Sequence, residues 1–305
     1  MKHIRHNCLV VLGLFLSFQS FALTPFQVQV DQAVPHGQFQ LGVGSHLKMV
    51  VPGAGQATDG VFLGRVVEST GTYGKFILLD LATTRVYLAD GSDVEMGTNL
   101  SAQPVIHQYD QIGGTCTGYA MDHILQQMYW SGYQGNGLLR QTLSTEQGRT
   151  QLLVDTINEY YLALQHKYSV FGVMKKFGTR FGFKCEKKTF DDADSASDYL
   201  EGKMERGLPV MISFSTGVTM VNSPFEVVDY ENQNPRKDMR LWIPRRIGER
   251  NGGGHTVVAA AMFEAKGRKQ LLMMDSDWAE PRVWDIQAYL GERAAITEME
   301  FITCE

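Results

Sequence analysis

The sequence predicts an α+β protein preceded by a small β-rich domain. Residues 23–98 contain short β-branched and aromatic runs separated by turns, which is typical of strands. Residues 116–206 carry apolar positions at helical spacing, and apolar runs after residue 207 are typical of buried strands. Helices followed by strands, and not alternating with them, favour an α+β domain. With 305 residues, of which 44% are hydrophobic, the chain is long and apolar enough to bury a core.

Residues 1–22 are typical of a cleaved signal peptide. Lys2 and Arg5 precede an apolar run over residues 8–18, and residues 20–22 (SFA) place small side chains where a signal peptidase acts. The apolar run is shorter than the ~20 residues of a membrane-spanning helix. We therefore expect an exported protein, secreted or periplasmic, without integral membrane association. The net charge of −5 argues against affinity for nucleic acid.

Residues 23–100 form the predicted β-rich domain. Runs such as VFLGRVV, KFILLDL and RVYLA are separated by glycine-containing turns. The sequence leaves three roles open for this domain: an inhibitory pro-region, a substrate- or wall-binding module, or a packed extension of the second domain. Residues 101–305 form that second predicted domain, in which residues 222–254 read as a long irregular insertion.

The cysteines remaining after the signal segment are Cys116, Cys185 and Cys304. An odd number is unusual in an oxidising compartment, where structural thiols are commonly paired. Cys185 and Cys304 are the candidate disulfide, which would tie the last residues to the body of the protein and leave Cys116 reactive. Three isolated thiols are the alternative.

Cys116 is the candidate nucleophile. Apolar residues over 119–129 recur at helical spacing, so Cys116 is expected at a helix N-terminus, where partial positive charge favours a thiolate. The preceding residues 113–115 (GGT) offer backbone amides, and Gln111 offers a side-chain amide, to a developing oxyanion. The alternative is a glycine turn before a buried helical cysteine.

His255 and Asp275 are the candidate partners of that thiol. His255 follows three glycines and opens an apolar strand, so its ring is expected at a strand end and suits a general base. Asp275 ends the next apolar strand, where a carboxylate would orient the imidazole and stabilise its charged form. Asp277 is the alternative orienting residue. The other histidines lack a paired carboxylate or a Cys-x-x-Cys motif, so we expect neither a metal site nor a cofactor.

With these residues the chain resembles the papain-like cysteine peptidase superfamily. Gln111, Cys116, His255 and Asp275 occur in that family's order of Gln, Cys, His and Asn or Asp. Cys116 and His255 are 139 positions apart, inside the family's range of about 130–150. The resemblance covers about residues 104–290.

Two departures from the family's cysteine motif narrow the resemblance. Gln111 lies five residues before the cysteine where the family has six, and Thr117 stands where the family has Trp. Asp275 also replaces the Asn of the plant and lysosomal branch. The chain is therefore similar to a divergent bacterial branch, the bacteriocin-processing or C39-like type.

The resemblance implies a papain-like fold, with a helical subdomain that carries the nucleophile and an antiparallel β subdomain that carries His and Asp. It implies hydrolysis of protein or peptide substrates through a Cys116–His255–Asp275 triad and an acyl-enzyme intermediate. Gln111 would help to hold the oxyanion, and Trp278 would shield the His–Asp pair from water. Two alternatives stay open: a deamidase or acyltransferase of the same fold acting on a host protein, and a catalytically inactive binding protein.

Overall fold

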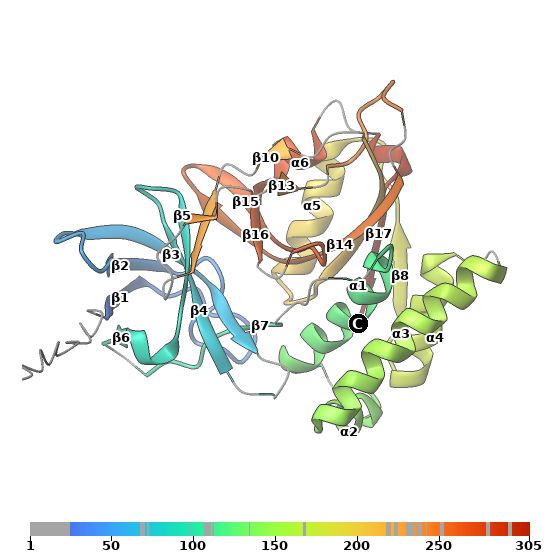
Figure 1. Ribbon diagram of the computed structural model, residues 1–305, viewed down its shortest axis with the longest axis horizontal. Coiled ribbons are helices and arrows are strands. Elements are labelled where there is room, and N and C mark those ends of the chain that lie inside the picture. The colour runs from blue at the N-terminus through green and yellow to red at the C-terminus, as the bar shows by residue number, and fades with distance from the viewer. Residues whose placement is uncertain are drawn as a thin grey trace, which may run out of the picture.

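The protein is a mixed α+β structure, as the sequence predicts, in a computed structural model of the chain. The structure describes residues 25–67, 71, 73–97, 99–106, 111, 113–133, 135–166, 169–217, 221–222, 225–229, 235–236, 240–241, 243–250, 253–278, 281–291 and 295–305. The predicted signal segment, residues 1–22, lies outside the described residues. A nine-stranded sheet, a six-stranded sheet, a two-stranded sheet and several helices make up the described part. Figure 1 shows how they are arranged.

A nine-stranded sheet forms the N-terminal part of the molecule (Figure 1). Its strands are β1 (Phe26–Gln32), β2 (His46–Val50), β3 (Ala57–Val67), β4 (Tyr73–Asp80), β5 (Arg85–Ala89), β6 (Val94–Met96), β7 (Pro104–Ile106), β11 (Glu226–Asp229) and β12 (Pro235–Arg236). Strands β1 to β5 run antiparallel in chain order, and a short 3-10 helix, η1 (Gly91–Asp93), leads into β6. Buried side chains such as Phe26, Leu47 and Phe62 form a core of its own under this sheet.

Two later segments complete this N-terminal sheet. Strand β7 pairs in parallel with β3, and β11, from the region predicted to be an irregular insertion, pairs in parallel with β5. The prediction of an irregular insertion is therefore wrong in part. A second core cluster also joins Val61 and Ile77 of the sheet to Ile124 of the first helix. The β-rich segment is thus packed onto the rest of the chain by strand pairing and by a shared core.

A six-stranded antiparallel sheet forms the C-terminal half. Its order is β16 (Arg282–Asp285), β15 (Arg268–Met274), β14 (Gly253–Ala265), β9 (Val210–Thr216), β17 (Glu300–Cys304) and β8 (Cys185–Lys188). Strands β9, β14 and β15 confirm the apolar strands expected after residue 207. The predicted Cys185–Cys304 disulfide is present and joins β8 to β17. The short strands β10 (Val221–Asn222) and β13 (Arg240–Leu241) pair with each other.

Helices cover both faces of this second sheet (Figure 1). On one side lie α1 (Cys116–Trp130), α2 (Leu138–Leu143), α3 (Glu146–His166) and α4 (Val170–Phe181), and on the other lie α5 (Ala193–Met204) and α6 (Ile286–Leu290), followed by the 3-10 helix η2 (Ile296–Glu298). Alternation along β14 explains this arrangement, because Val258 packs in the α1 core while Val257 and Ala259 pack in the α5 and α6 core. In the part of the chain that the structure describes, no helix has the length and apolar character to cross a bilayer.

Glycine permits the closest contact between helices α1 and α3. A Cβ at Gly118 would lie 2.9 Å from the Ile157 Cα, a distance that real Cβ atoms essentially never show. The absence of a side chain therefore lets α3 lie directly against the first turn of α1. This contact brings α3 beside the first residues of α1, where Cys116 lies.

Candidate active site

Cys116 is the first residue of α1, the position that the sequence predicts. It is buried, with 6% of its surface exposed, and it is the free cysteine among the described residues. The unpaired N–H groups and the dipole of the first helical turn favour negative charge at this end of a helix. The local fold therefore places the Cys116 thiol at the positive end of the helix dipole.

His255 and Asp275 meet at the ends of neighbouring strands. The imidazole Nε2 lies 2.9 Å from Asp275 Oδ1, and both side chains are buried, at 5% and 0% exposure. Asp275 directly follows β15, and the backbone N–H of Asp277 donates to the same Oδ1 at 3.1 Å. The edge of the Phe214 ring faces the imidazole at a centroid distance of 5.8 Å. The carboxylate and the imidazole are thus both fixed by their surroundings.

Cys116, the third member of the predicted triad, interacts with the same imidazole. Burial opposes the charged form of His255, but the Asp275 charge and the hydrogen bonds to Asp275 and Cys116 raise its pKa to about 10. The structure therefore brings together Cys116, His255 and Asp275 from three distant parts of the sequence.

Gln111 joins the loop before Cys116 to the turn after Asp275. Its backbone N–H donates to the Ser276 carbonyl at 2.7 Å, and its side-chain Oε1 accepts from the Ser276 hydroxyl at 2.7 Å. One hydrogen of its side-chain amide donates to the Gly113 carbonyl at 2.9 Å, and the amide carries a second hydrogen. Its oxyanion role stays a prediction.

Asp277 and Trp278 flank the same turn. The ligand atoms of His255, Asp275 and Asp277 all lie within 4.8 Å of one another, and among the described residues this is the group that could hold a metal ion. The expectation of no metal and no cofactor stays a prediction. The Trp278 ring lies 4.5 Å from the buried guanidinium of Arg282 in a cation–π contact. Shielding of the His–Asp pair by Trp278 also stays a prediction.

Three hydroxyl residues beside the triad were missed by the sequence analysis. Thr117 and Thr256 are buried, and their Oγ1 atoms lie 2.9 Å apart. Tyr160 of α3 hydrogen-bonds to Thr117; burial raises the pKa of Tyr160, while that hydrogen bond lowers it. The one signal in the sequence was the position of the two threonines, which directly follow Cys116 and His255.

Two further ionisable groups near the site are strongly perturbed. Burial raises the pKa of Asp122, on α1, to about 7, against a lowering effect of its hydrogen bond with Gln126. Burial and the nearby charge of Asp275 raise the pKa of Tyr289 well above its usual value. Asp122 therefore keeps its proton in a pH range where an exposed Asp has lost it, and Tyr289 stays neutral to higher pH than an exposed Tyr.

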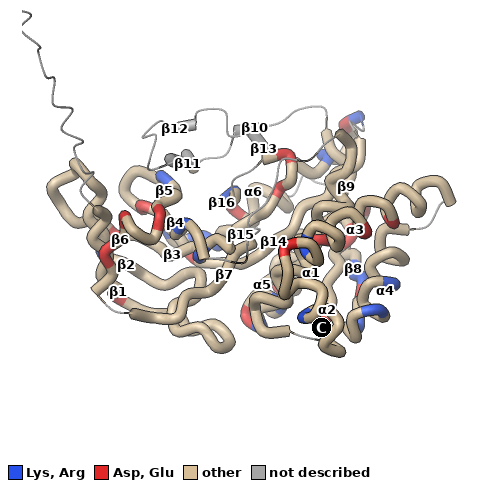
Figure 2. The backbone as a smooth tube through the Cα atoms, turned by 60° about the horizontal axis from the view of Figure 1, so that its bottom comes forward, with Lys and Arg blue, Asp and Glu red and all other residues tan. Residues whose placement is uncertain are grey.

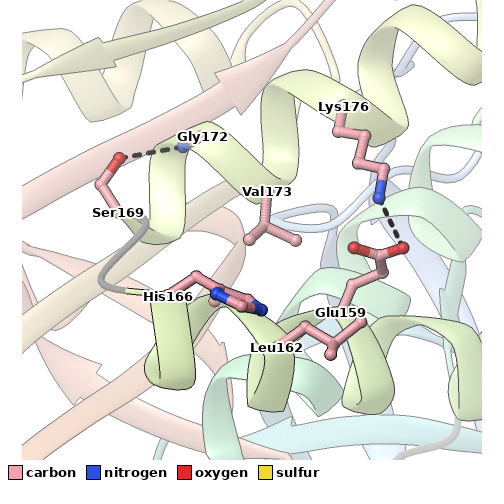
Figure 3. A pocket seen from close by; sticks show the side chains of 8 residues that line it. Glu159, Leu162, His166, Ser169, Gly172, Val173 and Lys176 are labelled. Atoms are coloured by element: carbon pink, nitrogen blue, oxygen red, sulfur yellow. Dashed lines mark hydrogen bonds and ion pairs between the residues drawn. The ribbon is translucent and has the colours of Figure 1, made fainter.

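A cavity of about 480 Å³ lies between α3 and α4 (Figure 3). Its lining residues are Glu159, Leu162, Ala163, His166, Ser169, Gly172, Val173 and Lys176. An ion pair of 2.6 Å between Lys176 of α4 and Glu159 of α3 spans one end of the cavity. The basic residues of α4 stand out in Figure 2. None of the sequence-predicted site residues lines this cavity.

Comparison with known proteins gives no independent assignment of these residues. No protein-family model matches the chain, and no curated protein matches it in sequence.

Proposed function

We propose that the protein is an exported cysteine peptidase of papain-like type that hydrolyses peptide bonds. The observation that carries the proposal is one buried imidazole that hydrogen-bonds to both Asp275 and Cys116. A helical layer that begins with the nucleophile and an antiparallel sheet that supplies His255 and Asp275 agree with the division expected of a papain-like fold. A nucleophile, a base and an orienting group within hydrogen-bond reach are the signature of this chemistry.

The first half of the proposed reaction forms a thioester. The Cys116 thiolate attacks the carbonyl carbon of the substrate, and the amides near Cys116 with the Gln111 side chain stabilise the oxyanion. Collapse of the tetrahedral intermediate breaks the C–N bond, and the proton on His255 passes to the leaving amine. Asp275 keeps the ring in position throughout, because its carboxylate holds Nε2.

The second half releases the acid product. Water attacks the thioester carbonyl and gives a proton to the now neutral His255, and the sulfur leaves as the thiolate beside the recharged ring. A pKa of about 10 means that His255 is charged in the resting enzyme at neutral pH. The imidazolium therefore both stabilises the thiolate and holds the proton that the leaving amine requires.

Export is supported by the signal-like sequence of residues 1–22 and by the Cys185–Cys304 disulfide. Disulfides persist in oxidising compartments and are rare in the cytosol. Measuring the mass of the protein recovered from the periplasm or medium tests this, with a new N-terminus after residue 22 as the expected result.

The activity is tested by thiol-directed epoxide labelling and by hydrolysis of a generic casein substrate. We expect one label per chain on Cys116, and loss of both label and hydrolysis in Cys116→Ala and His255→Ala. No reductant is added before labelling, so that Cys185 and Cys304 stay blocked. If the protein is labelled but releases ammonia from a glutamine-rich target and does not cleave the backbone, the site is that of a deamidase. If the folded protein is not labelled, the alternative of a catalytically inactive binding protein is supported.

A further inference from the structure

A chain of hydroxyl groups crosses from the nucleophile helix to the strand of the proposed base. Thr117 Oγ1 lies 2.9 Å from Thr256 Oγ1, and Thr256 Oγ1 donates to Ser213 Oγ at 3.3 Å. We call Thr117, Thr256 and Ser213 the hydroxyl chain.

The hydrogen atoms of this chain have one consistent direction. Each hydroxyl has a single hydrogen. Since Thr256 donates to Ser213, its neighbour across β9 and β14, Thr117 must donate to Thr256. Hydrogen bonds aligned in this way polarise and strengthen one another in a buried setting.

The hydroxyl chain acts on the residues directly before its two threonines. Thr117 follows Cys116 at the start of α1, and Thr256 follows His255 on β14. Successive side chains of a strand point to opposite faces, so Thr256 meets α1 while His255 meets Asp275 on the other face. Fixing Thr256 to Thr117 therefore fixes the backbone between the two reacting groups.

Apolar contacts also pack α1 against β14, through residues such as Ile124 and Val258. Apolar contact is non-directional and tolerates small sliding movements. A hydrogen bond between buried hydroxyls requires defined distance and angle. The hydroxyl chain thus supplies the directional constraint at the end of the interface where the sulfur and imidazole meet.

We propose that Thr117 and Thr256 are positioning residues that set the separation of the Cys116 sulfur from the His255 ring. This inference rests on the proposed function and adds residues to it. Neither threonine needs to touch the substrate. Their effect is exerted on the thiolate–imidazolium pair, and it is measurable without any substrate.

The test uses Thr117→Val and Thr256→Val in the full chain, with Thr117→Ser and Thr256→Ser as hydroxyl-retaining partners. The readouts are thiolate ultraviolet absorbance and the rate of iodoacetamide alkylation as functions of pH, followed by kcat/KM. We expect each hydroxyl-deleting variant to raise the pH at which the thiolate forms and to lower kcat/KM about tenfold, as the loss of one buried hydrogen bond implies. The serine variants should stay near wild type.

Thr303→Val is the matched control, because Thr303 is a buried threonine of the same sheet whose hydroxyl donates to the Pro209 carbonyl at 2.9 Å. It should lose stability without moving the thiolate profile. Ser213 at the end of the hydroxyl chain is partly buried, so Ser213→Ala is the variant to measure where a valine variant does not fold. Unchanged thiolate profiles in the folded hydroxyl-deleting variants would overturn the proposal. A wild-type protein without a thiolate signal that depends on His255 would instead overturn the proposed function.

Discussion

Gln111 and Ser276 are joined twice, by a backbone N–H that donates to a carbonyl and by a hydroxyl that donates to the Gln111 side chain, each at 2.7 Å. Ser276 directly follows Asp275, and Gln111 precedes Cys116 by one short loop. The two ends of the proposed triad are therefore connected outside the imidazole as well as through it.

Substitution of Gln111 separates its proposed catalytic role from this structural one. Gln111→Ala removes both the amide donor and the side-chain contact with Ser276 and keeps the backbone contact, so we expect kcat to fall about a hundredfold or more. Ser276→Ala removes the side-chain contact alone and should cost about tenfold or less. Steady-state kinetics on both variants, with exposed Gln29→Ala as control, provide the measurement. Equal losses in the two variants would assign Gln111 to positioning only.

The activity should disappear in the alkaline range as His255 loses its proton. Its pKa is raised to about 10, so the stability that its charged form contributes is complete below about 6.5 and is lost as pH rises through about 10. Asp275→Asn removes the main group that raises this pKa. We expect the alkaline limb of kcat/KM to move down by at least about one pH unit in that variant. Titration of the imidazole by NMR, in wild type and Asp275→Asn, checks the assignment directly.

Asp122 should make the protein less stable as pH rises. Its folded pKa of about 7 lies above that of an unfolded Asp, so stability falls between about pH 4 and pH 7 as the unfolded chain loses its proton first. Asp122→Asn should remove this fall and raise the free energy of unfolding at pH 8 by a few kcal/mol, on the order of the pKa difference. Denaturant unfolding at pH 5 and pH 8 measures it, with exposed Asp31→Asn as control. An equal loss of stability with rising pH in wild type and Asp122→Asn would mean that other groups cause the pH dependence.

Gly118→Ala should push α3 away from the nucleophile helix. The added methyl group meets the Ile157 backbone at 2.9 Å, and overpacking of this kind costs about 1–3 kcal/mol. Gly202→Ala on α5 is the matched control, because its Cβ would meet nothing within 4 Å and should stabilise its helix by about 0.5–1 kcal/mol. Thermal unfolding of both variants tests the pair. A stabilised Gly118→Ala would mean that α3 moves away without cost.

Removal of residues 23–100 should unfold the remaining chain. Strands β7 and β11 would lose their partners β3 and β5, and helix α1 would lose the apolar side chains of the first sheet. We expect the 101–305 fragment to be insoluble or to lack a cooperative unfolding transition by circular dichroism. A folded and active fragment would instead identify residues 23–100 as a removable pro-region, with a mature N-terminus shortly before Tyr109.

The sequence was sufficient for features with a local signature. Apolar runs predicted β9, β14 and β15, and helical spacing placed Cys116 at the start of α1. The parity of the cysteines suggested the Cys185–Cys304 bond, which the structure contains. The positions of His255 and Asp275 at strand ends could also be predicted from the sequence, because each residue borders an apolar run.

The missed features depend on contacts between distant segments. Strand β11 pairs with β5 across a long stretch of the sequence, and a strand of four residues carries no mark of its partner. The contact of Thr117 with Thr256 was invisible for the same reason, since a threonine beside a candidate catalytic residue is an ordinary neighbour until the fold opposes the two hydroxyls.

Strand β17, residues 300–304, lies between β9 and β8. During synthesis, β9 therefore lacks one of its two neighbours until the ribosome has passed residue 304, although Cys116, His255 and Asp275 are already made. At that stage the growing chain contains Cys116, His255 and Asp275 but not the complete six-stranded sheet. We therefore expect the six-stranded sheet to be completed only after this strand has been translated.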